Sequence, residues 1–181
     1  PNMSIIAPCD PAEARAATQY AASRPDGGPI YLRLGKVGEP DLTGSAAEPF
    51  EFGRIRHLRR GVGRVAVVSY GVLMKEATEV ADRLSATHGP VSLVSVPTLK
   101  PLDREGLAAV LREHEQVVVM EEHAPVGGLA SQTTSLAWEI GARCRLHTFT
   151  LKDEFVHCYG THGELLAAHG ITVDAVLASV D

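Results

Sequence analysis

The feature that most constrains this sequence is a regular alternation of apolar, strand-like runs with helix-like segments over residues 64–181. Parallel strands are buried on both faces, so they read as near-continuous apolar runs, and helical crossovers connect them. The alternation therefore predicts an α/β fold, with a mainly parallel sheet and helices on both faces. The expected strands cover residues 64–71, 91–96, 116–122 and 145–151, and the expected helices cover residues 72–87, 104–114, 128–141, 162–168 and 172–180.

Residues 1–36 predict a strand, a helix and a second strand. Asp10 is placed to cap the helix and Pro11 to occupy its first turn. A β-α-β unit of this size buries too little apolar surface to fold alone, so we expect it to be the remnant of a second α/β domain. The strands are expected at residues 4–7 and 29–34, the helix at 11–23, and a turn at RPDGG, residues 24–28.

Residues 37–63 are rich in Gly, Pro and charge, which is typical of a connection between domains. The charge balance also changes here: residues 1–62 hold eight Lys and Arg against seven Asp and Glu, whereas residues 63–181 hold nine against fifteen. We expect one exposed strand near Phe52 to Leu58. The predicted organisation is the end of one domain at 1–36, a linker at 37–63 and a last domain at 64–181.

Composition argues against several classes of protein. The formal net charge is −5 and no basic face is clustered, so we expect no nucleic-acid partner. No run of about 18 apolar residues occurs, so we expect no membrane span. Cys9, Cys144 and Cys158 form no CxxC pair, and an odd count leaves one unpaired, which favours a reducing, cytoplasmic compartment. The chain enters a strand pattern directly after Pro1. We therefore expect no signal peptide, and we expect the sequence to be a piece of a longer protein.

The stretch VVVMEEHAPVGGLAS, residues 117–131, places two carboxylates, an imidazole and two glycines at the end of an apolar strand. Ligands bind at this edge of parallel sheets, and a helix start offers free N–H groups to an anion. Adjacent strand residues point to opposite faces, so only one of the two carboxylates, Glu121 or Glu122, can join the imidazole, while the other serves a cap or an ion pair. For the glycines, close packing of helix on sheet is the structural alternative. The candidate residues of an anion-binding or subunit-interface loop are Glu122, His123, Gly127 and Gly128.

Two further motifs are better explained by structure than by chemistry. HCYGTH offers His157, Cys158 and His162, but a closed zinc site needs four ligands and no further Cys or His follows a diagnostic spacing, so we expect no metal site. In TLKPLD, Pro101 fixes the backbone and Asp103 is placed to cap the following helix.

Arg33 is the most informative single residue, because YLRL places a guanidinium at the carboxyl end of an otherwise apolar strand. A buried arginine needs a paired anion. That anion is either a protein carboxylate or a substrate phosphate, which the planar guanidinium suits. The residues alone leave both alternatives open.

Several segments, in this order, resemble the carboxyl-terminal part of the transketolase family of thiamine diphosphate enzymes. The resemblance runs over essentially the whole chain, and the segments are PNMSIIAPCDPAEARAA with GPIYLRLGK, VAVVSYGVLMKEA, VPTLKPLD and VVVMEEHAPVGGLAS. It implies that residues 1–36 end a pyrimidine-binding domain, and that residues 64–181 form the C-terminal domain, which mainly supports the dimer. It also places Arg33 where transketolases have an arginine that binds the phosphate of the sugar substrate.

The resemblance implies a transferase that moves a two-carbon ketol unit between sugars, with thiamine diphosphate and Mg²⁺ in the complete enzyme. The family's GDG motif is absent from this sequence and the activating glutamate belongs upstream, so it implies no catalytic residue, no bound cofactor and no activity for the isolated chain. The implied partners are the rest of the transketolase, as an upstream segment or a separate subunit, a second copy in a homo-oligomer, and a sugar substrate. A 2-oxo acid dehydrogenase β subunit, a deoxyxylulose-phosphate synthase and a non-catalytic regulatory module are the alternatives.

Overall fold

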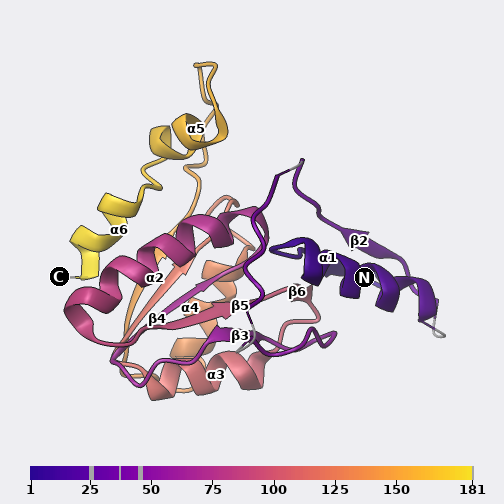
Figure 1. Ribbon diagram of the computed structural model, residues 1–181, viewed down its shortest axis with the longest axis horizontal. Helices are drawn as coiled ribbons and strands as arrows, with labels where there is room; N and C mark the ends of the chain where they lie inside the picture. The colour runs from indigo at the N-terminus through magenta and orange to yellow at the C-terminus, as the bar shows by residue number, and fades with distance from the viewer. Residues whose placement is uncertain (25–26, 37, 45–46, 181) are drawn as a thin grey trace.

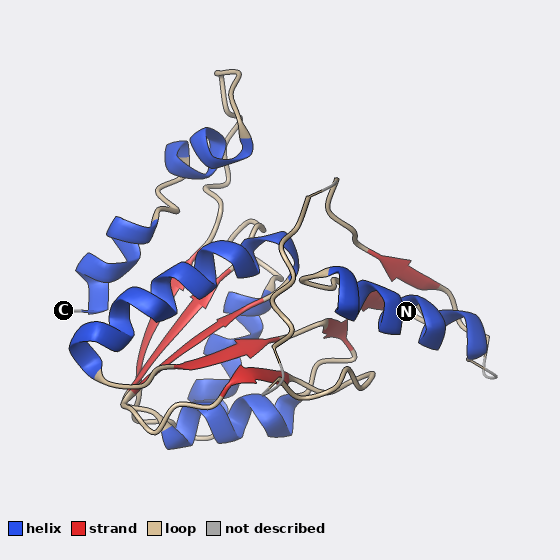
Figure 2. Ribbon diagram, viewed as in Figure 1, coloured by secondary structure: helices blue, strands red, loops and turns tan. Residues whose placement is uncertain are grey.

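The described part of the chain forms two sheets covered by helices (Figures 1 and 2). The computed structural model describes residues 1–24, 27–36, 38–44 and 47–180. Residues 25 and 26 of the expected RPDGG turn therefore lie outside the described residues, as do residues 37, 45 and 46 of the predicted linker. The two ends of the chain lie at opposite sides of the molecule in Figure 1.

The larger sheet has five strands in the order β3-β5-β4-β7-β8. Strands β5, β4, β7 and β8 are parallel, and β3 is antiparallel to β5 at one edge. The prediction of a mainly parallel sheet is confirmed. The strands are β3 (Arg56–Arg59), β4 (Val65–Ser69), β5 (Ser92–Ser95), β7 (Gln116–Met120) and β8 (Arg145–Phe149).

Helices cover both faces of this sheet, as predicted, because alternate strand residues point to opposite sides. Val65 and Val67 of β4 pack in one apolar cluster with helices α2, α5 and α6, whereas Ala66 and Val68 pack in the other with α3 and α4. A short 3₁₀ turn, η1 (Gly71–Leu73), precedes α2, so this helix begins later than expected. The helices are α2 (Met74–His88), α3 (Arg104–Glu113), α4 (Leu129–Glu139), α5 (His162–Ala168) and α6 (Val173–Val180).

The smaller sheet joins the N-terminal unit to the rest of the chain. Its order is β2-β1-β6, with β1 parallel to β2 and antiparallel to β6. The β-α-β prediction for the N-terminal unit is confirmed. The segment TLKPLD, in which Asp103 caps α3 as expected, also contributes to this sheet, which was not predicted. Its first three residues are a strand that pairs with β1, because β1 would otherwise leave one edge without hydrogen bonds. The elements are β1 (Ser4–Ile6), α1 (Pro11–Ser23), β2 (Ile30–Leu32) and β6 (Thr98–Lys100).

The strand expected near Phe52 to Leu58 also differs from the prediction. The observed strand, β3, starts at Arg56 and is mostly buried at the edge of the main sheet rather than exposed. A strand with this many basic residues can be buried because Arg56 is paired: its side chain is 4% exposed and its Nη1 lies 3.1 Å from Oε1 of Glu13 on α1.

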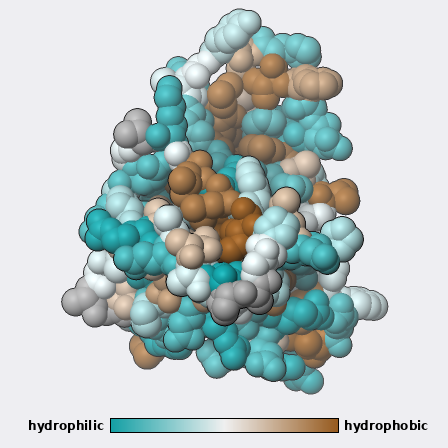
Figure 3. All heavy atoms as spheres, turned by 90° about the vertical axis from the view of Figure 1, so that its right-hand side faces the viewer, coloured by the Kyte–Doolittle hydropathy of each residue, from teal (hydrophilic) through white to brown (hydrophobic). Residues whose placement is uncertain are grey.

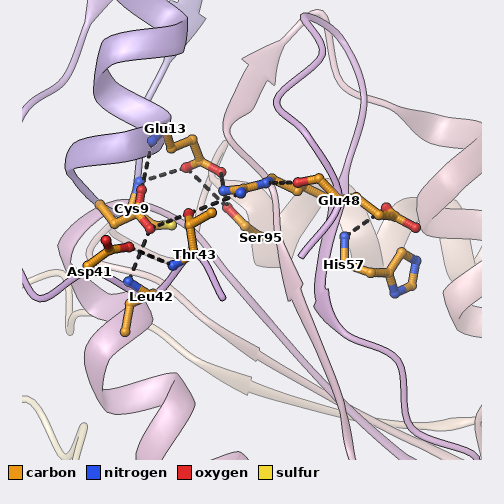
Figure 4. Close-up of polar contacts among 10 residues, drawn as sticks. Cys9, Glu13, Asp41, Leu42, Thr43, Glu48, His57 and Ser95 are labelled. Atoms are coloured by element: carbon orange, nitrogen blue, oxygen red, sulfur yellow. Dashed lines mark hydrogen bonds and ion pairs between the residues drawn. The ribbon is translucent and has the colours of Figure 1, made fainter. Parts of the chain in front are cut away.

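A buried polar cluster surrounds Glu13 and connects α1 with β5 and the segment before β3 (Figure 4). The Glu13 carboxylate also accepts hydrogen bonds from the Cys9 backbone N–H at 2.7 Å and from the Ser95 hydroxyl at 3.2 Å. Asp10 caps α1 by accepting from the Glu13 N–H at 2.7 Å, as predicted. Burial raises the pKa of the Glu13 carboxyl and of the Cys9 thiol. The N-terminal unit is thus fixed to the main sheet by charge and hydrogen bonds as well as by β6.

Among the described residues, no single helix has the length and apolar composition needed to cross a bilayer, and α5 and α6 meet that test only taken together, across a 41° bend.

Candidate functional site

Arg33 crosses from the N-terminal unit to the carboxyl end of β7. Its backbone N–H donates to the Ile6 carbonyl at 2.8 Å, which continues the β1–β2 pairing and fixes where the side chain starts. The guanidinium then donates to Glu122 twice, from Nη1 to the backbone carbonyl and from Nη2 to Oε2, both at 3.4 Å. It lies 5.9 Å from the centre of the Tyr70 ring. The Arg33 side chain nevertheless keeps 36% of its surface exposed, so it is held but still accessible to a ligand.

Glu122 has a second basic neighbour. Its Oε1 contacts Nε2 of His162, the first residue of α5, while Oε2 faces Arg33. The Glu122 side chain is 15% exposed and the His162 side chain 51%. Glu122 is therefore a mostly buried carboxylate between two groups that can carry positive charge.

Glu121 points the other way and is fully buried. Its carboxylate accepts from the Leu129 and Ala130 N–H groups, both at 2.8 Å, and from the Tyr70 hydroxyl at 3.1 Å. It thus caps the start of α4, as was expected for one of the two glutamates. Burial, with the Glu121 charge next in importance, raises the pKa of Tyr70, so this hydroxyl stays protonated and donates.

The candidate loop residues at the start of α4 are placed by this cap. A Cβ on Gly128 would lie 2.4 Å from the Glu121 carboxylate oxygens, so the glycine permits the close approach of helix and strand end. Gly127 has a φ of +85°, which favours glycine. His123 is exposed and its Nδ1 bonds the Ala124 carbonyl at 2.8 Å. Because Glu121 bonds the N–H groups of residues 129 and 130, those two groups are not free for an external anion.

Two hollows adjoin Arg33. The first, which we call the Arg33 hollow, encloses about 460 Å³, a size that suits a small metabolite. Its charged and polar lining consists of Arg33, Lys36, Glu39, Tyr70, Glu122 and His162. The second encloses about 510 Å³ and brings Arg33 together with Lys100, His123, Gly127 and Gly128. Arg33 is the predicted site residue that the two hollows share.

The face of the molecule that carries the N-terminal unit is partly apolar. Figure 3 shows brown, apolar atoms gathered at the centre of this face, with more above them in the part that contains α5. Met3, Tyr31 and Leu34 of the N-terminal unit are each about half exposed. Exposed apolar surface of this kind is typical of a contact with another polypeptide.

Sequence reasoning missed Lys36 and Tyr70 and assigned His162 only to a poor metal motif. Tyr70 could have been found, because it follows β4 directly and Glu121 follows β7, its parallel neighbour. Residues at the carboxyl ends of adjacent parallel strands lie at one edge of a sheet. His157 and Cys158 are exposed, and no group of three or more metal-ligating side chains occurs among the residues that the structure describes.

Comparison with known proteins identifies the family. Residues 53–176 match the model of the transketolase C-terminal domain. The chain belongs to the transketolase C-terminal domain family. This match begins within the predicted linker, 37–63. The α/β architecture also agrees with that of a solved split-gene transketolase, an inactive beta4 tetramer, with a TM-score of 0.85 and 34% identity over 99% of this chain and 57% of the other.

Curated relatives of this transketolase family member are longer. A 1-deoxy-D-xylulose-5-phosphate synthase from Chromohalobacter salexigens is 34% identical over 99% of this chain and 27% of its own length. One of the subunits of an apulose-4-phosphate transketolase from Actinobacillus succinogenes is 31% identical over 97% of this chain and 55% of its own length. The chain thus spans about a quarter to a half of these relatives. A transketolase from Leishmania mexicana shares the fold, with a TM-score of 0.64 and 21% identity.

Proposed function

We propose that this chain is the C-terminal portion or a subunit of a thiamine diphosphate-dependent transketolase that transfers a two-carbon ketol unit between sugar phosphates. In this proposal Arg33 binds the substrate phosphate, residues 1–36 complete a pyrimidine-binding domain, residues 37–63 connect, and residues 64–181 form the C-terminal domain. The family match supports the enzyme class. Two relatives are named after phosphorylated sugars, 1-deoxy-D-xylulose 5-phosphate and apulose 4-phosphate, and these names support the substrate class.

The placement of Arg33 is the observation that carries the phosphate assignment. A guanidinium presents paired N–H donors that match two phosphate oxygens. Arg33 offers such donors at the wall of a hollow large enough for a sugar phosphate, with the Lys36 ammonium on the same wall. The Tyr70 ring beside the guanidinium restricts its orientation without neutralising it. Of the two alternatives open from sequence, protein carboxylate or phosphate, the first is observed in this structure and the second is the proposal.

The GDG motif with which the family holds Mg²⁺ and the diphosphate of the cofactor is absent from this sequence. Among the described residues, no group of three or more His, Cys, Asp or Glu side chains is placed to hold a metal ion. We therefore assign the cofactor to the partner polypeptide, and this chain's role to holding the phosphate end of the substrate. On this assignment the isolated chain is inactive.

The partner assignment follows from the same reasoning. The relatives include one subunit of a multi-subunit transketolase and a split-gene tetramer, which supports a separate or upstream polypeptide and association between copies of this chain. The half-exposed apolar residues of the N-terminal unit supply surface for such contacts. We place the assembly in the cytoplasm, where Cys9, Cys144 and Cys158 stay reduced.

The test is a kinetic comparison in the assembled enzyme, that is, this chain together with the polypeptide that carries the cofactor site. Arg33→Gln should raise KM for ribose 5-phosphate by roughly tenfold or more, because a charge-assisted hydrogen bond contributes about 1.5–3 kcal/mol. KM for unphosphorylated ribose should change little. Equal losses with both acceptors would refute the phosphate assignment.

A deoxyxylulose-phosphate synthase is the second candidate function, and the 34% identity to one such enzyme favours it. Arg33 would serve the same purpose there, because that product is also a sugar phosphate. The assembled enzyme discriminates between the two: formation of 1-deoxy-D-xylulose 5-phosphate supports the synthase, and ketol transfer between two sugar phosphates supports the transketolase.

A further inference from the structure

Glu122 occupies the donors of Arg33 that the proposed function assigns to a substrate phosphate. Its Oε2 and its backbone carbonyl each lie 3.4 Å from a guanidinium nitrogen. A phosphate that used the same nitrogens would meet the carboxylate, and two like charges at that distance repel. Binding of a phosphate at these two nitrogens would therefore require the Glu122 carboxylate to move or to be neutralised.

The Arg33–Glu122 pair is looser than the ion pair that holds the fold together. Arg56 and Glu13 approach to 3.1 Å with side chains only 4% and 0% exposed. Arg33 and Glu122 are separated by 3.4 Å, with 36% and 15% of their side chains exposed. Solvent reaches the Arg33 side of this pair and screens it more than it screens the buried pair, so a ligand can compete for Arg33.

His162 is a second hydrogen-bonding partner to which the Glu122 carboxylate can turn. The Nε2 of His162 already contacts Oε1, the oxygen that does not face Arg33. A carboxylate that is mostly buried needs a partner when it loses another, because an unpaired buried charge is costly. A protonated imidazole supplies both a donor and a full positive charge.

We propose that Glu122 is an internal counter-ion of Arg33 that is released to His162 when a phosphate ester binds, which makes Glu122 and His162 positioning residues for the phosphate. This inference rests on the proposed function, because it takes Arg33 as the phosphate site. It assigns part of substrate binding to residues that follow β7 and begin α5, elements of the C-terminal domain rather than of the N-terminal unit.

The charges around the Arg33 hollow are balanced when His162 is neutral. Arg33 and Lys36 are positive and Glu39 and Glu122 are negative. The Tyr70 hydroxyl is neutral because its pKa is raised. Because His162 lies next to Glu122, its imidazole can hold the carboxylate away from Arg33 and so favour an anion in the hollow.

Other charged groups lie near the hollow, of which one is committed to another contact and two are tested by control variants. Glu164 belongs to α5 itself, where it accepts hydrogen bonds from Thr161, so it is committed to the helix cap. Lys100 and His123 line the second hollow beside Arg33. A His123→Gln variant therefore controls for the loss of an imidazole near Arg33, and Glu39→Gln removes a carboxylate that lines the Arg33 hollow but does not pair with Arg33.

The experiment measures sulfate binding to the full chain by NMR, following the Arg33 Nε–Hε signal, which Arg33→Gln identifies by its disappearance. Sulfate is the probe because it is a tetrahedral dianion, like a phosphate monoester. Glu122→Gln should tighten sulfate binding by about two- to fivefold, the range of one partly exposed charge pair. Glu39→Gln should change it less. His162→Gln, which removes the imidazole that receives the Glu122 carboxylate, should weaken sulfate binding, whereas His123→Gln should not.

The outcomes separate this inference from the proposed function. If sulfate binding needs Arg33 but is unchanged or weaker in Glu122→Gln, and is unchanged in His162→Gln, the counter-ion role is wrong while the phosphate site stands. If sulfate does not bind, or binds equally well to Arg33→Gln, both are wrong. Because half of the His162 side chain is exposed, its replacement should leave folding intact, and this variant carries the test even if Glu122→Gln folds poorly.

Discussion

Removing Arg56 should be among the most destabilising single substitutions in this protein. Arg56→Met keeps much of the side-chain volume but leaves the Glu13 carboxylate, whose side chain is 0% exposed, without its cation. Breaking a buried pair by removing one partner typically costs about 3–5 kcal/mol. Glu13 keeps its hydrogen bonds from the Cys9 N–H and the Ser95 hydroxyl, which places the expected cost toward the lower end, near 3 kcal/mol. Against a typical stability of about 5–15 kcal/mol, that loss is large.

Urea unfolding followed by far-UV circular dichroism measures this loss. Fluorescence is a poor alternative, because the protein's one tryptophan, Trp138, is 89% exposed in the folded state. The double variant Glu13→Gln with Arg56→Met removes both charges and should be more stable than Arg56→Met alone. The loss in Arg56→Met should also be smaller at pH 5 than at pH 8, because an acid whose folded-state pKa is raised loses stability as pH increases. A cost below about 1 kcal/mol, or a double variant as unstable as the single one, would refute the reasoning.

Three further predictions concern other parts of the fold. Gly128→Ala should destabilise by about 1–3 kcal/mol in the same urea assay, because its Cβ would press on the Glu121 carboxylate, whereas unchanged stability would contradict the packing described above. Burial, with Arg60 next in importance, lowers the pKa of His57. The unfolded chain then takes up a proton first as pH falls below about 6.5, so stability should decrease there, and less so in His57→Gln. With Ellman's reagent the exposed Cys158 should react at once, while the buried Cys9, whose thiol pKa is raised, should react only on unfolding; equal rates would contradict the burial of Cys9.

Local signals in the sequence were sufficient for most of the secondary structure. Asp10 and Pro11 predicted the start of α1 because a cap acts within three residues, and the same holds for Asp103, whose carboxylate accepts from the Gly106 N–H at 2.9 Å. The apolar runs predicted β4 and β7 because burial on both faces leaves a continuous pattern. The ends of these strands were predicted less well. The strand expected at residues 64–71 ends at Ser69, because Tyr70, although extended, already leads into a 3₁₀ turn.

Contacts between distant segments could not be predicted in the same way. Strand β6 has three residues, too few to show an alternating pattern, and its partner β1 lies more than ninety positions earlier. The need of Arg33 for an anion was evident from the sequence, but the choice of Glu122, 89 residues away, depends on how the two sheets meet. His162 was grouped with His157 and Cys158 because they are close in sequence, whereas its contact is with Glu122 on another element.

The pairing of β1 with β6 has a consequence for the connection between the two parts of the chain. A continuous backbone between residues 37 and 55 is not needed to keep the N-terminal unit in place, because β6 and the Arg56–Glu13 pair already attach it noncovalently. A protease that nicks the chain near residue 40, before Arg56, should therefore give two fragments that stay associated during gel filtration and separate only in denaturant. The two fragments should therefore complement each other without a covalent link, and the Arg33–Glu122 contact should survive a break in the backbone between these two residues.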